Sequence, residues 1–214
     1  MNKVTTGSFI TFEGGEGAGK STQIKRLAAR LEALSVPVTL TREPGGSPGA
    51  EEIRTLLVTG EGDRWSGLSE SLLHFAARAD HLERLIKPAR SRGDWVLCDR
   101  FADSTLAYQG GGHGLNSAAI QTLYDLVVGA QGPDLTLILD LPVEAGLARA
   151  ASRGEGEDRY EKMGLAFHER LRAAFLEIAR QNPQRCVVID ATFDIDTVEA
   201  AIWTAVSKRF SLSS

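Results

Sequence analysis

The chain has 214 residues, of which 43% are hydrophobic and 24% charged, and its formal net charge is −4. This apolar content excludes a disordered chain, and the acidic balance provides no global positive field that would hold nucleic acid. The 22 glycines gather at 14–19, 45–49 and 110–114, where the backbone must turn tightly or come close to another group.

Short β-rich runs alternate with amphipathic helical segments along the chain. The expected strands are, in order, 8–13, 37–41, 95–99, 135–141 and 186–190. The expected helices are 20–34, 69–90, 116–128, 143–152, 163–181 and 197–209, with Ser69 and Asn116 as N-caps. Several strands are apolar throughout, which is typical of strands buried on both faces of a parallel sheet. The pattern predicts one α/β domain over 1–214, with a doubly wound, five-stranded parallel sheet.

The remaining composition indicates a soluble cytoplasmic protein. Cys98 and Cys186 stand far apart in apolar runs, so we expect two buried free thiols, as suits a reducing compartment. No apolar stretch approaches the ~18 residues of a membrane span, and the N-terminus lacks the apolar core of a signal peptide. We therefore expect no membrane partner.

Residues 14–21, GGEGAGKS, follow the first expected strand directly and match the phosphate-loop pattern G-x-x-x-x-G-K-[ST]. In such a loop, backbone N–H groups and the next helix N-terminus surround phosphate oxygens. Lys20 would reach the β- and γ-phosphates, and the Ser21 hydroxyl would ligate Mg²⁺. A random chain of this length matches the pattern on the order of 1% of the time, before the flanking strand and helix are considered. The expected nucleotide-binding residues are Gly14, Gly15, Glu16, Gly17, Ala18, Gly19, Lys20, Ser21 and Thr22.

A phosphate loop alone does not distinguish a GTPase, a motor ATPase and a kinase. The GTPase tetrapeptide N-K-x-D is absent, and the chain is small for a motor. A kinase for a small acceptor remains, and it needs a second anion site facing the first.

Charged pairs end two further expected strands, Asp99-Arg100 on the third and Arg42-Glu43 on the second. Strand carboxyl ends face the ligand crevice of a doubly wound sheet. There Asp99 would hold Mg²⁺-bound water, and Arg100 would form a forked contact with a phosphate. A capping carboxylate beside a solvated arginine is the alternative, which the neighbouring phosphate loop disfavours.

Taken in order, several segments resemble the bacterial thymidylate kinases over nearly the whole chain. They are FEGGEGAGKST, TREPGG, FAAR, DRFADSTLAYQGG, PDLTLILDL, RGEGEDRYE and VIDAT. The resemblance implies a P-loop kinase fold with a short lid at about 149–161. It also implies a homodimer that phosphorylates dTMP to dTDP with ATP and Mg²⁺.

The resemblance further implies a role for each matching residue. Glu16 would accept from the deoxyribose 3′-hydroxyl, Arg42 and Arg100 would hold the acceptor phosphate, and Glu43 and Asp99 would lie near the metal. Arg54 and Arg78 would face the thymine edge, Gln109 would bond the base, and Thr105 would line the pocket. Glu16 and Tyr108 would crowd a 2′-hydroxyl, so UMP would be a poor substrate. Glycines 45–46 and 110–112 would border the acceptor pocket.

Two features depart from the usual family pattern. Many members place Phe four residues before the arginine of FAAR, where this chain has His74, followed by Phe75. One position turns a side chain by ~100° around a helix, so either ring is a candidate to stack on the base, and we favour Phe75.

The phosphate loop also lacks the arginine that some members carry there. By composition, 153–160 reads as a surface loop, but the resemblance implies that a lid arginine replaces the missing one. Arg153 fits best as the catalytic group, with Arg149, beside ATP, and Arg159 as its neighbours.

Two other functions remain open. One is a kinase for another nucleoside monophosphate, which an acceptor panel would separate. The other is a non-catalytic ATP-binding module, which would bind ATP tightly without acceptor-dependent release of ADP.

Overall fold

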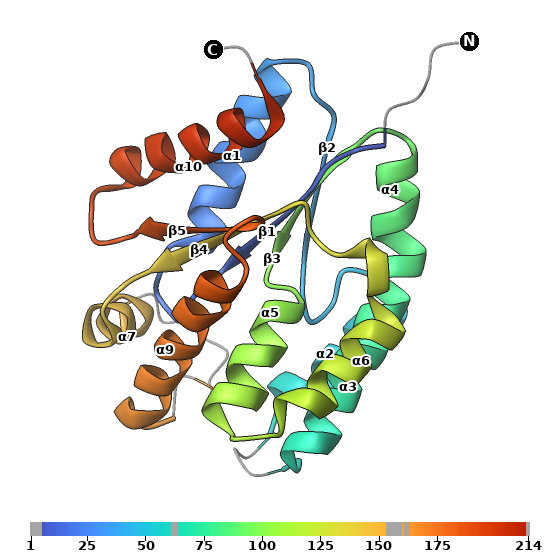
Figure 1. Cartoon of the computed structure of the whole chain (residues 1–214), viewed down its shortest axis with the longest axis vertical. Helices are drawn as coiled ribbons and strands as arrows, with labels where there is room; N and C mark the ends of the chain where they lie inside the picture. The colour runs from blue at the N-terminus through green and yellow to red at the C-terminus, as the bar shows by residue number, and fades with distance from the viewer. Residues whose placement is uncertain (1–5, 61–63, 153–159, 161–162, 213–214) are drawn as a thin grey trace.

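The computed structural model describes residues 6–60, 64–152, 160 and 163–212. Its centre is a five-stranded parallel sheet in the order β2-β3-β1-β4-β5 (Figure 1). The strands are β1 (Phe9–Glu13), β2 (Val38–Arg42), β3 (Trp95–Asp99), β4 (Leu135–Asp140) and β5 (Cys186–Asp190). The predicted doubly wound α/β fold is confirmed, and every predicted strand end lies within one residue of the observed end.

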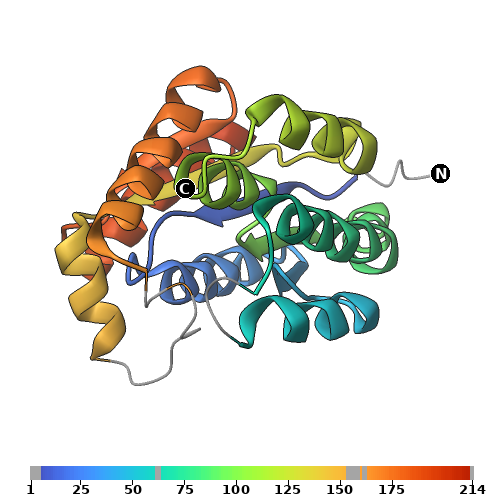
Figure 2. The same cartoon turned by 90° about the horizontal axis from the view of Figure 1, so that it is seen from below.

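Helices cover both faces of the sheet. They are α1 (Lys20–Ala33), α2 (Pro48–Val58), α3 (Gly67–His81), α4 (Lys87–Ser91), α5 (Ala102–Thr105), α6 (Ser117–Val127), α7 (Val143–Ala151), α9 (Leu165–Gln181) and α10 (Ile195–Phe210). Two π-helical turns, η1 (Leu82–Ile86) and η2 (Leu106–Gly112), and the 3₁₀ turn η3 (Gly129–Gln131) complete the described helical segments. Helices α1 and α10 cover one face, whereas α3, α5, α6 and α9 lie on the other (Figures 1 and 2).

Strand β1 lies in the middle of the sheet and is buried on both faces. Ile10 and Phe12 pack into the apolar cluster under α1 and α10, and Phe9 packs into the cluster on the opposite face. This alternation follows from the two-residue period of a strand. Burial of each such side chain contributes about 1.5–3 kcal/mol, so the strand that leads into residues 14–19 is firmly held.

The predicted helix 69–90 begins earlier than expected. Ser66 is its N-cap and accepts a hydrogen bond from the Ser69 backbone N–H at 3.2 Å, so the expectation of Ser69 as the N-cap was wrong. The helix then continues through η1 into α4. Asn116 is the N-cap of α6, as expected, and accepts from the Ala118 N–H at 2.9 Å.

Helices α2, α5 and η2 were not predicted. Proline and glycine lower the helix propensity of α2 and η2, and α5 has only four residues. The glycines of η2 have a packing role instead. A Cβ on Gly111 would lie 2.5 Å from the Ala174 Cβ, and one on Gly112 would lie 2.5 Å from the Phe167 ring. The expectation that 110–112 border the acceptor pocket is therefore corrected for these two glycines: they let η2 approach α9 closely.

The state of the two cysteines and the length of the helices can be compared with the expectations from composition. Cys98 and Cys186 are free and buried, as predicted. Within the described ranges, none of the helices combines the length and apolar character needed to cross a membrane.

Candidate active site

The phosphate loop joins β1 to α1. One side of the loop packs closely against α7, and the other side is open. Gly17 has φ +68°, and a Cβ there would lie 2.0 Å from the Gly146 carbonyl oxygen on α7. Gly19 has φ +89°, and a Cβ there would meet nothing within 4 Å. The loop backbone thus faces open space at the start of α1, where helix N–H groups favour an anion.

Lys20 lies across the inside of this loop. Its ammonium Nζ donates to the carbonyl oxygens of Gly14 at 3.1 Å and Gly15 at 2.8 Å, and the residue is only 7% exposed. Burial, with the nearby Arg100 guanidinium, lowers the pKa of Lys20 to about 8. A buried ammonium whose hydrogen-bond partners among the described residues are backbone carbonyls is suited to meet incoming phosphate oxygens.

Ser21 and Asp99 lie together at the carboxyl edge of the sheet. The Ser21 hydroxyl donates to Asp99 Oδ2 at 2.8 Å, because β1 and β3 are neighbours and α1 starts beside the end of β3. A hydroxyl and a carboxylate are hard oxygen ligands, and Mg²⁺ in phosphate-transfer sites takes one or two such ligands with the rest from phosphate and water. The predicted metal-binding pair is therefore brought together and fits this ion.

Arg100 links the end of β3 to the phosphate loop. It adopts φ +67°, and its guanidinium donates to the Gly14 carbonyl at 3.1 Å and to Glu16 Oε1 at 2.8 Å. The Tyr108 hydroxyl donates to the same Glu16 oxygen at 2.6 Å. The structure therefore brings together three residues that the sequence analysis expected at the acceptor.

Glu16 is held as a carboxylate. Burial alone would raise its pKa, but Arg100, Lys20 and the Tyr108 hydroxyl lower the pKa of Glu16 to about 2. A fixed anion thus lies between the phosphate loop and the adjoining pocket, where it can accept a hydrogen bond from a ligand hydroxyl.

A pocket of about 390 Å³ opens beside Glu16 and Arg100, and its wall includes His74, Arg78, Thr105, Tyr108 and Gln109. Arg78 is 2% exposed and donates through Nε to Glu43 at 2.8 Å and through Nη2 to Thr105 at 3.1 Å. Its third nitrogen, Nη1, and the Gln109 carbonyl oxygen Oε1 are buried without a hydrogen-bond partner among the described residues. A buried donor and a buried acceptor without partners are costly unless a ligand pairs with them.

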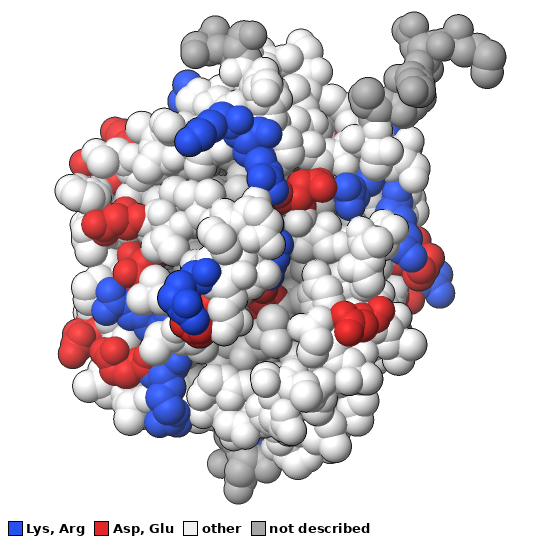
Figure 3. All heavy atoms as spheres, in the orientation of Figure 1, with Lys and Arg blue, Asp and Glu red and all other residues white. Residues whose placement is uncertain are grey.

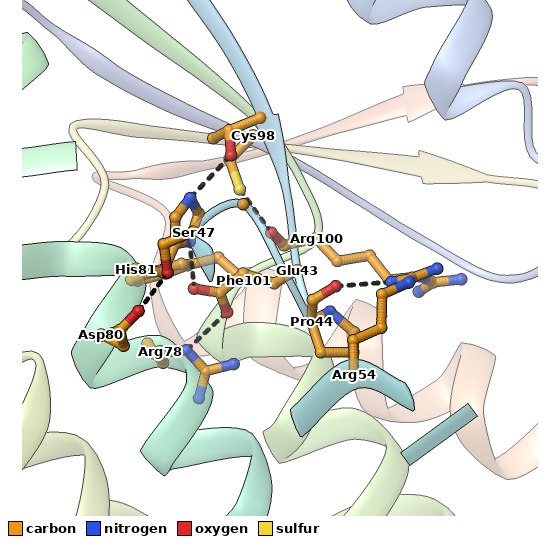
Figure 4. Close-up of polar contacts among 12 residues, drawn as sticks. Glu43, Pro44, Ser47, Arg54, Arg78, Asp80, His81, Cys98, Arg100 and Phe101 are labelled. Atoms are coloured by element: carbon orange, nitrogen blue, oxygen red, sulfur yellow. Dashed lines mark hydrogen bonds and ion pairs between the residues drawn. The ribbon is translucent and has the colours of Figure 1, made fainter. Parts of the chain in front are cut away.

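Glu43 lines this pocket and lies between Arg78 and His81 (Figure 4). Its Oε1 contacts His81 Nδ1 at 3.0 Å, and its Oε2 accepts from Arg78. Both of these partners lie on α3, whereas the Glu43 backbone N–H donates to the Asp99 carbonyl at 2.9 Å, so the expected position of Glu43 near the metal stays a prediction. Glu43 orients Arg78, and Ser21 and Asp99 form the oxygen pair at the metal position.

Arg54 lies on α2 and contacts the segment that follows β2. Its guanidinium donates to the Pro44 carbonyl at 2.6 Å, and Figure 4 shows it reaching toward Arg100. Burial and the charges of Arg42 and Arg100 lower the pKa of Arg54. Arg54 does not line the pocket among the described residues and lies near the arginines expected at the acceptor phosphate, so its expected contact with the thymine edge stays a prediction. Arg42 is more exposed and contacts Glu51 at 3.2 Å.

The two candidate stacking rings have different surroundings. Phe75 is 2% exposed and packs in the core with Phe9 and Phe101, where its ring lies 4.7 Å from the Arg78 guanidinium carbon. His74 lines the pocket. The preference for Phe75 is thus corrected: Phe75 packs against Arg78 in the core, and His74 is the ring that lines the pocket.

A second pocket lies on the outer side of the phosphate loop, and sequence reasoning missed the side formed by Phe193 and Ile195. It is lined by Gly17, Gly19, Thr22, Arg149, Phe193 and Ile195, among others. Phe193, in the loop after β5, and Ile195, the first residue of α10, are 57% and 53% exposed, so two large apolar side chains lie open to solvent at this pocket. Arg149 donates to the Ala191 carbonyl at 3.2 Å, so it is held at this pocket.

Residues Arg153 and Arg159 of the expected lid lie outside the described residues. Tyr160 is described and was missed as a site residue: it is buried, its hydroxyl donates to Glu70, and its ring lies 5.1 Å from that of Tyr108. The letters RYE that contain it were attributed to the lid, which hid its contact with α3.

Glu13, the last residue of β1, was also missed. It is fully buried and accepts hydrogen bonds from the Phe101 N–H at 2.8 Å and the Ser104 hydroxyl at 2.6 Å. Burial and the nearby Asp103 raise the pKa of Glu13 to about 8. It ties the start of the phosphate loop to the segment that follows Arg100.

The chain is similar to several known proteins. Residues 12–202 match the family model described as thymidylate kinase. The chain is 62% identical to a thymidylate kinase of Caulobacter vibrioides over 209 residues, covering 98% of this chain and 100% of the relative. It is 54% identical to one of Magnetococcus marinus, with 97% and 99% covered. The fold resembles the crystal structure of thymidylate kinase from Ehrlichia chaffeensis, with TM-score 0.76, 37% identity and 94% and 99% of the chains covered.

Proposed function

The chain belongs to the thymidylate kinase family and phosphorylates dTMP, and from this we propose which groups bind donor, metal and acceptor. The observation that carries the proposal is a pair of buried groups that have no hydrogen-bond partner among the described residues, Arg78 Nη1 and Gln109 Oε1. One is a donor and the other an acceptor, and both belong to residues of the pocket wall. Thymine offers the complementary pair, the O4 acceptor and the N3–H donor.

We propose ATP as the phosphate donor. Its phosphates would follow the backbone of the phosphate loop, with Lys20 against the β- and γ-oxygens. The adenine would lie between Arg149 and the exposed side chains of Phe193 and Ile195, which offer a flat, partly apolar surface next to the loop.

Mg²⁺ would be held by Asp99 and the Ser21 hydroxyl, whose oxygens already lie 2.8 Å apart. When bound, this ion would neutralise the negative charge that develops on the phosphate oxygens. Asp99 and Ser21 are fixed by β3 and α1, so they are placed before substrate arrives.

The acceptor phosphate would lie among Arg42, Arg54 and Arg100, and the deoxyribose 3′-hydroxyl would donate to Glu16. Arg100 is well placed for this role, because its contacts to Gly14 and Glu16 hold it beside the phosphate loop. His74 would stack on the base from the pocket wall. The two phosphates would then meet between Lys20 and Arg100.

Transfer of the phosphoryl group requires alignment and charge neutralisation more than covalent chemistry. The acceptor phosphate of dTMP is already ionised near neutral pH, so no strong general base is needed. Lys20 and Arg100 would hold the two phosphates in line, and Arg153 would add the positive charge that the phosphate loop lacks.

We also propose that the protein is a cytoplasmic homodimer. The surface over α6 and the adjoining part of α3 carries few charged side chains in the view of Figure 3, and Leu126 on α6 and Leu72 on α3 are 80% and 49% exposed. A surface with few charges and exposed leucine side chains favours a second copy of the chain as its partner. Light scattering coupled to gel filtration tests this, with twice the mass of 23.1 kDa expected.

The functional proposal is tested by measuring ADP release with ATP, Mg²⁺ and dTMP. Activity that needs all three supports it. Release of ADP that does not depend on dTMP, or activity unchanged when Mg²⁺ is chelated, would contradict it.

A further inference from the structure

We propose that Glu70 determines the selectivity of the acceptor pocket for thymine over cytosine by fixing which end of the Gln109 amide faces the base. The inference rests on the proposed function, in which Gln109 and Arg78 read the base edge. Glu70 would act without touching the substrate, because it lies behind Gln109 and is not part of the pocket wall within the described residues. It is therefore a positioning residue.

The contact that carries the inference joins α3 to η2. Gln109 Nε2 donates to Glu70 Oε1 at 3.2 Å, and the two residues are each only 1% exposed. The Tyr160 hydroxyl donates to the same Glu70 oxygen. A carboxylate oxygen accepts hydrogen bonds, so it requires the NH₂ end of the amide on its side. The carbonyl end Oε1 is consequently the end that is buried without a partner among the described residues.

The orientation of this amide matters because thymine and cytosine present opposite patterns of hydrogen-bond donors and acceptors. Thymine has an N3–H donor beside its O4 acceptor, which complement Gln109 Oε1 and Arg78 Nη1. Cytosine has an N3 acceptor beside an N4 amino donor, so both contacts become mismatched. Arg78 cannot adapt, because a guanidinium is only a donor and its other nitrogens are engaged by Glu43 and Thr105.

Gln109 can adapt unless something prevents it. The terminal torsion of glutamine is broad and roughly two-fold, so the amide can rotate by about 180° and exchange its ends. The rotated amide would donate to N3 of cytosine and remove one of the two mismatches. Glu70 prevents this rotation, because rotation would place the amide oxygen against its carboxylate. Without this restraint the Gln109 amide could pair with either pyrimidine.

The test replaces the fixed acceptor with a group that can serve as donor or acceptor. Glu70→Gln keeps the size of the side chain and allows either amide orientation. The ratio of kcat/KM for dTMP to kcat/KM for dCMP is measured with ATP and Mg²⁺. We expect the ratio to fall at least ~10-fold, the scale for relieving one mispaired buried group, while the KM for ATP is unchanged.

A matched control and a double-mutant cycle separate this from a general loss of structure. Glu177→Gln makes the same chemical change on the exposed surface of α9, where Glu177 contacts Arg180, and should leave the ratio unchanged. Gln109→Met alone should lower the ratio, and in that background Glu70→Gln should change it less than ~2-fold further.

Three results would overturn the inference. One is a ratio that Glu70→Gln leaves unchanged, and another is the same fall in the Gln109→Met background. If Glu70→Gln does not fold, Gln109→Met decides alone, and an unchanged ratio in that variant is the third. A wild-type protein that did not phosphorylate dTMP would contradict the proposed function itself, and this inference with it.

Discussion

The Ser21 hydroxyl donates to Asp99 Oδ2 across 2.8 Å, although the two residues are 78 positions apart in the chain. The contact exists because β1 and β3 pair in parallel, so the first turn of α1 and the end of β3 lie at one edge of the sheet. It places a hydroxyl and a carboxylate beside the phosphate loop before any ligand binds. The reaction therefore starts from a site in which these two oxygens are already in place.

Asp99→Asn should lower kcat at least ~100-fold and raise the Mg²⁺ concentration needed for half-maximal activity, because the amide removes a charged metal ligand. A magnesium titration of activity measures both effects. Asp94→Asn, just before the other end of β3, is the matched control and should leave the magnesium dependence unchanged. Equal magnesium dependence in the Asp99 variant and the wild type would show that Asp99 does not hold the metal.

Lys20→Met and Arg153→Ala should each lower kcat at least ~100-fold, the scale for loss of a transition-state charge contact. Lys20 is buried across the phosphate loop, whereas Lys25 on the same helix is exposed, so Lys25→Met is the control. Steady-state kinetics with saturating dTMP and ATP give the values. A near-normal kcat in the Arg153 variant would refute the assignment of that arginine.

His74→Ala should weaken dTMP binding, whereas Phe75→Ala should lower the stability of the fold. His74 lines the acceptor pocket, so its removal should raise the KM for dTMP at least ~5-fold, the lower range for loss of base stacking. Phe75 is a core residue, and its truncation should lower the free energy of unfolding by about 3–5 kcal/mol. Urea denaturation and dTMP titration separate the two. If Phe75→Ala weakened dTMP binding more than His74→Ala and left stability intact, the assignment would be reversed.

Glu13 should make stability depend on pH. Its folded-state pKa of about 8 exceeds the ordinary value of 4.5, so the folded protein binds the extra proton between these values. The stabilisation is fully present below about pH 4.5 and is lost as the pH rises through about 8, with a slope of up to about 1.4 kcal/mol per pH unit.

Glu13→Gln removes this titration while it retains the side-chain shape. The free energy of unfolding of the wild type, minus that of the variant, should therefore decrease from pH 5 to pH 8. Chemical denaturation at several pH values gives this difference. A difference that stays constant over that range would mean that Glu13 does not titrate there.

The sequence was sufficient for the sheet and for the position of the phosphate loop, because both depend on short-range patterns. Apolar runs identified all five strands, and the spacing from Gly14 to Ser21 identified the phosphate loop. The Ser21–Asp99 contact also followed, since the ends of neighbouring parallel strands must meet.

Other features depend on which face of an element a side chain occupies, and residue type does not reveal this. Neighbours in the chain, His74 and Phe75, point to the pocket and to the core respectively. The contact between Glu70 and Gln109 joins residues 39 positions apart and requires η2, a helical turn that its three glycines concealed. Glu43 carried the right chemistry for a metal site, but α3 supplies its partners.

The most direct test of the account is an acceptor panel with ATP and Mg²⁺ that compares dTMP with dCMP, UMP, AMP and GMP. The Arg78 donor and the Gln109 acceptor, which lack partners within the described part of the chain, and the proposed place of Glu16 and Tyr108 at the sugar predict a kcat/KM for dTMP at least ~100-fold above each of the others. Equal or faster phosphorylation of any other acceptor in the panel would contradict it.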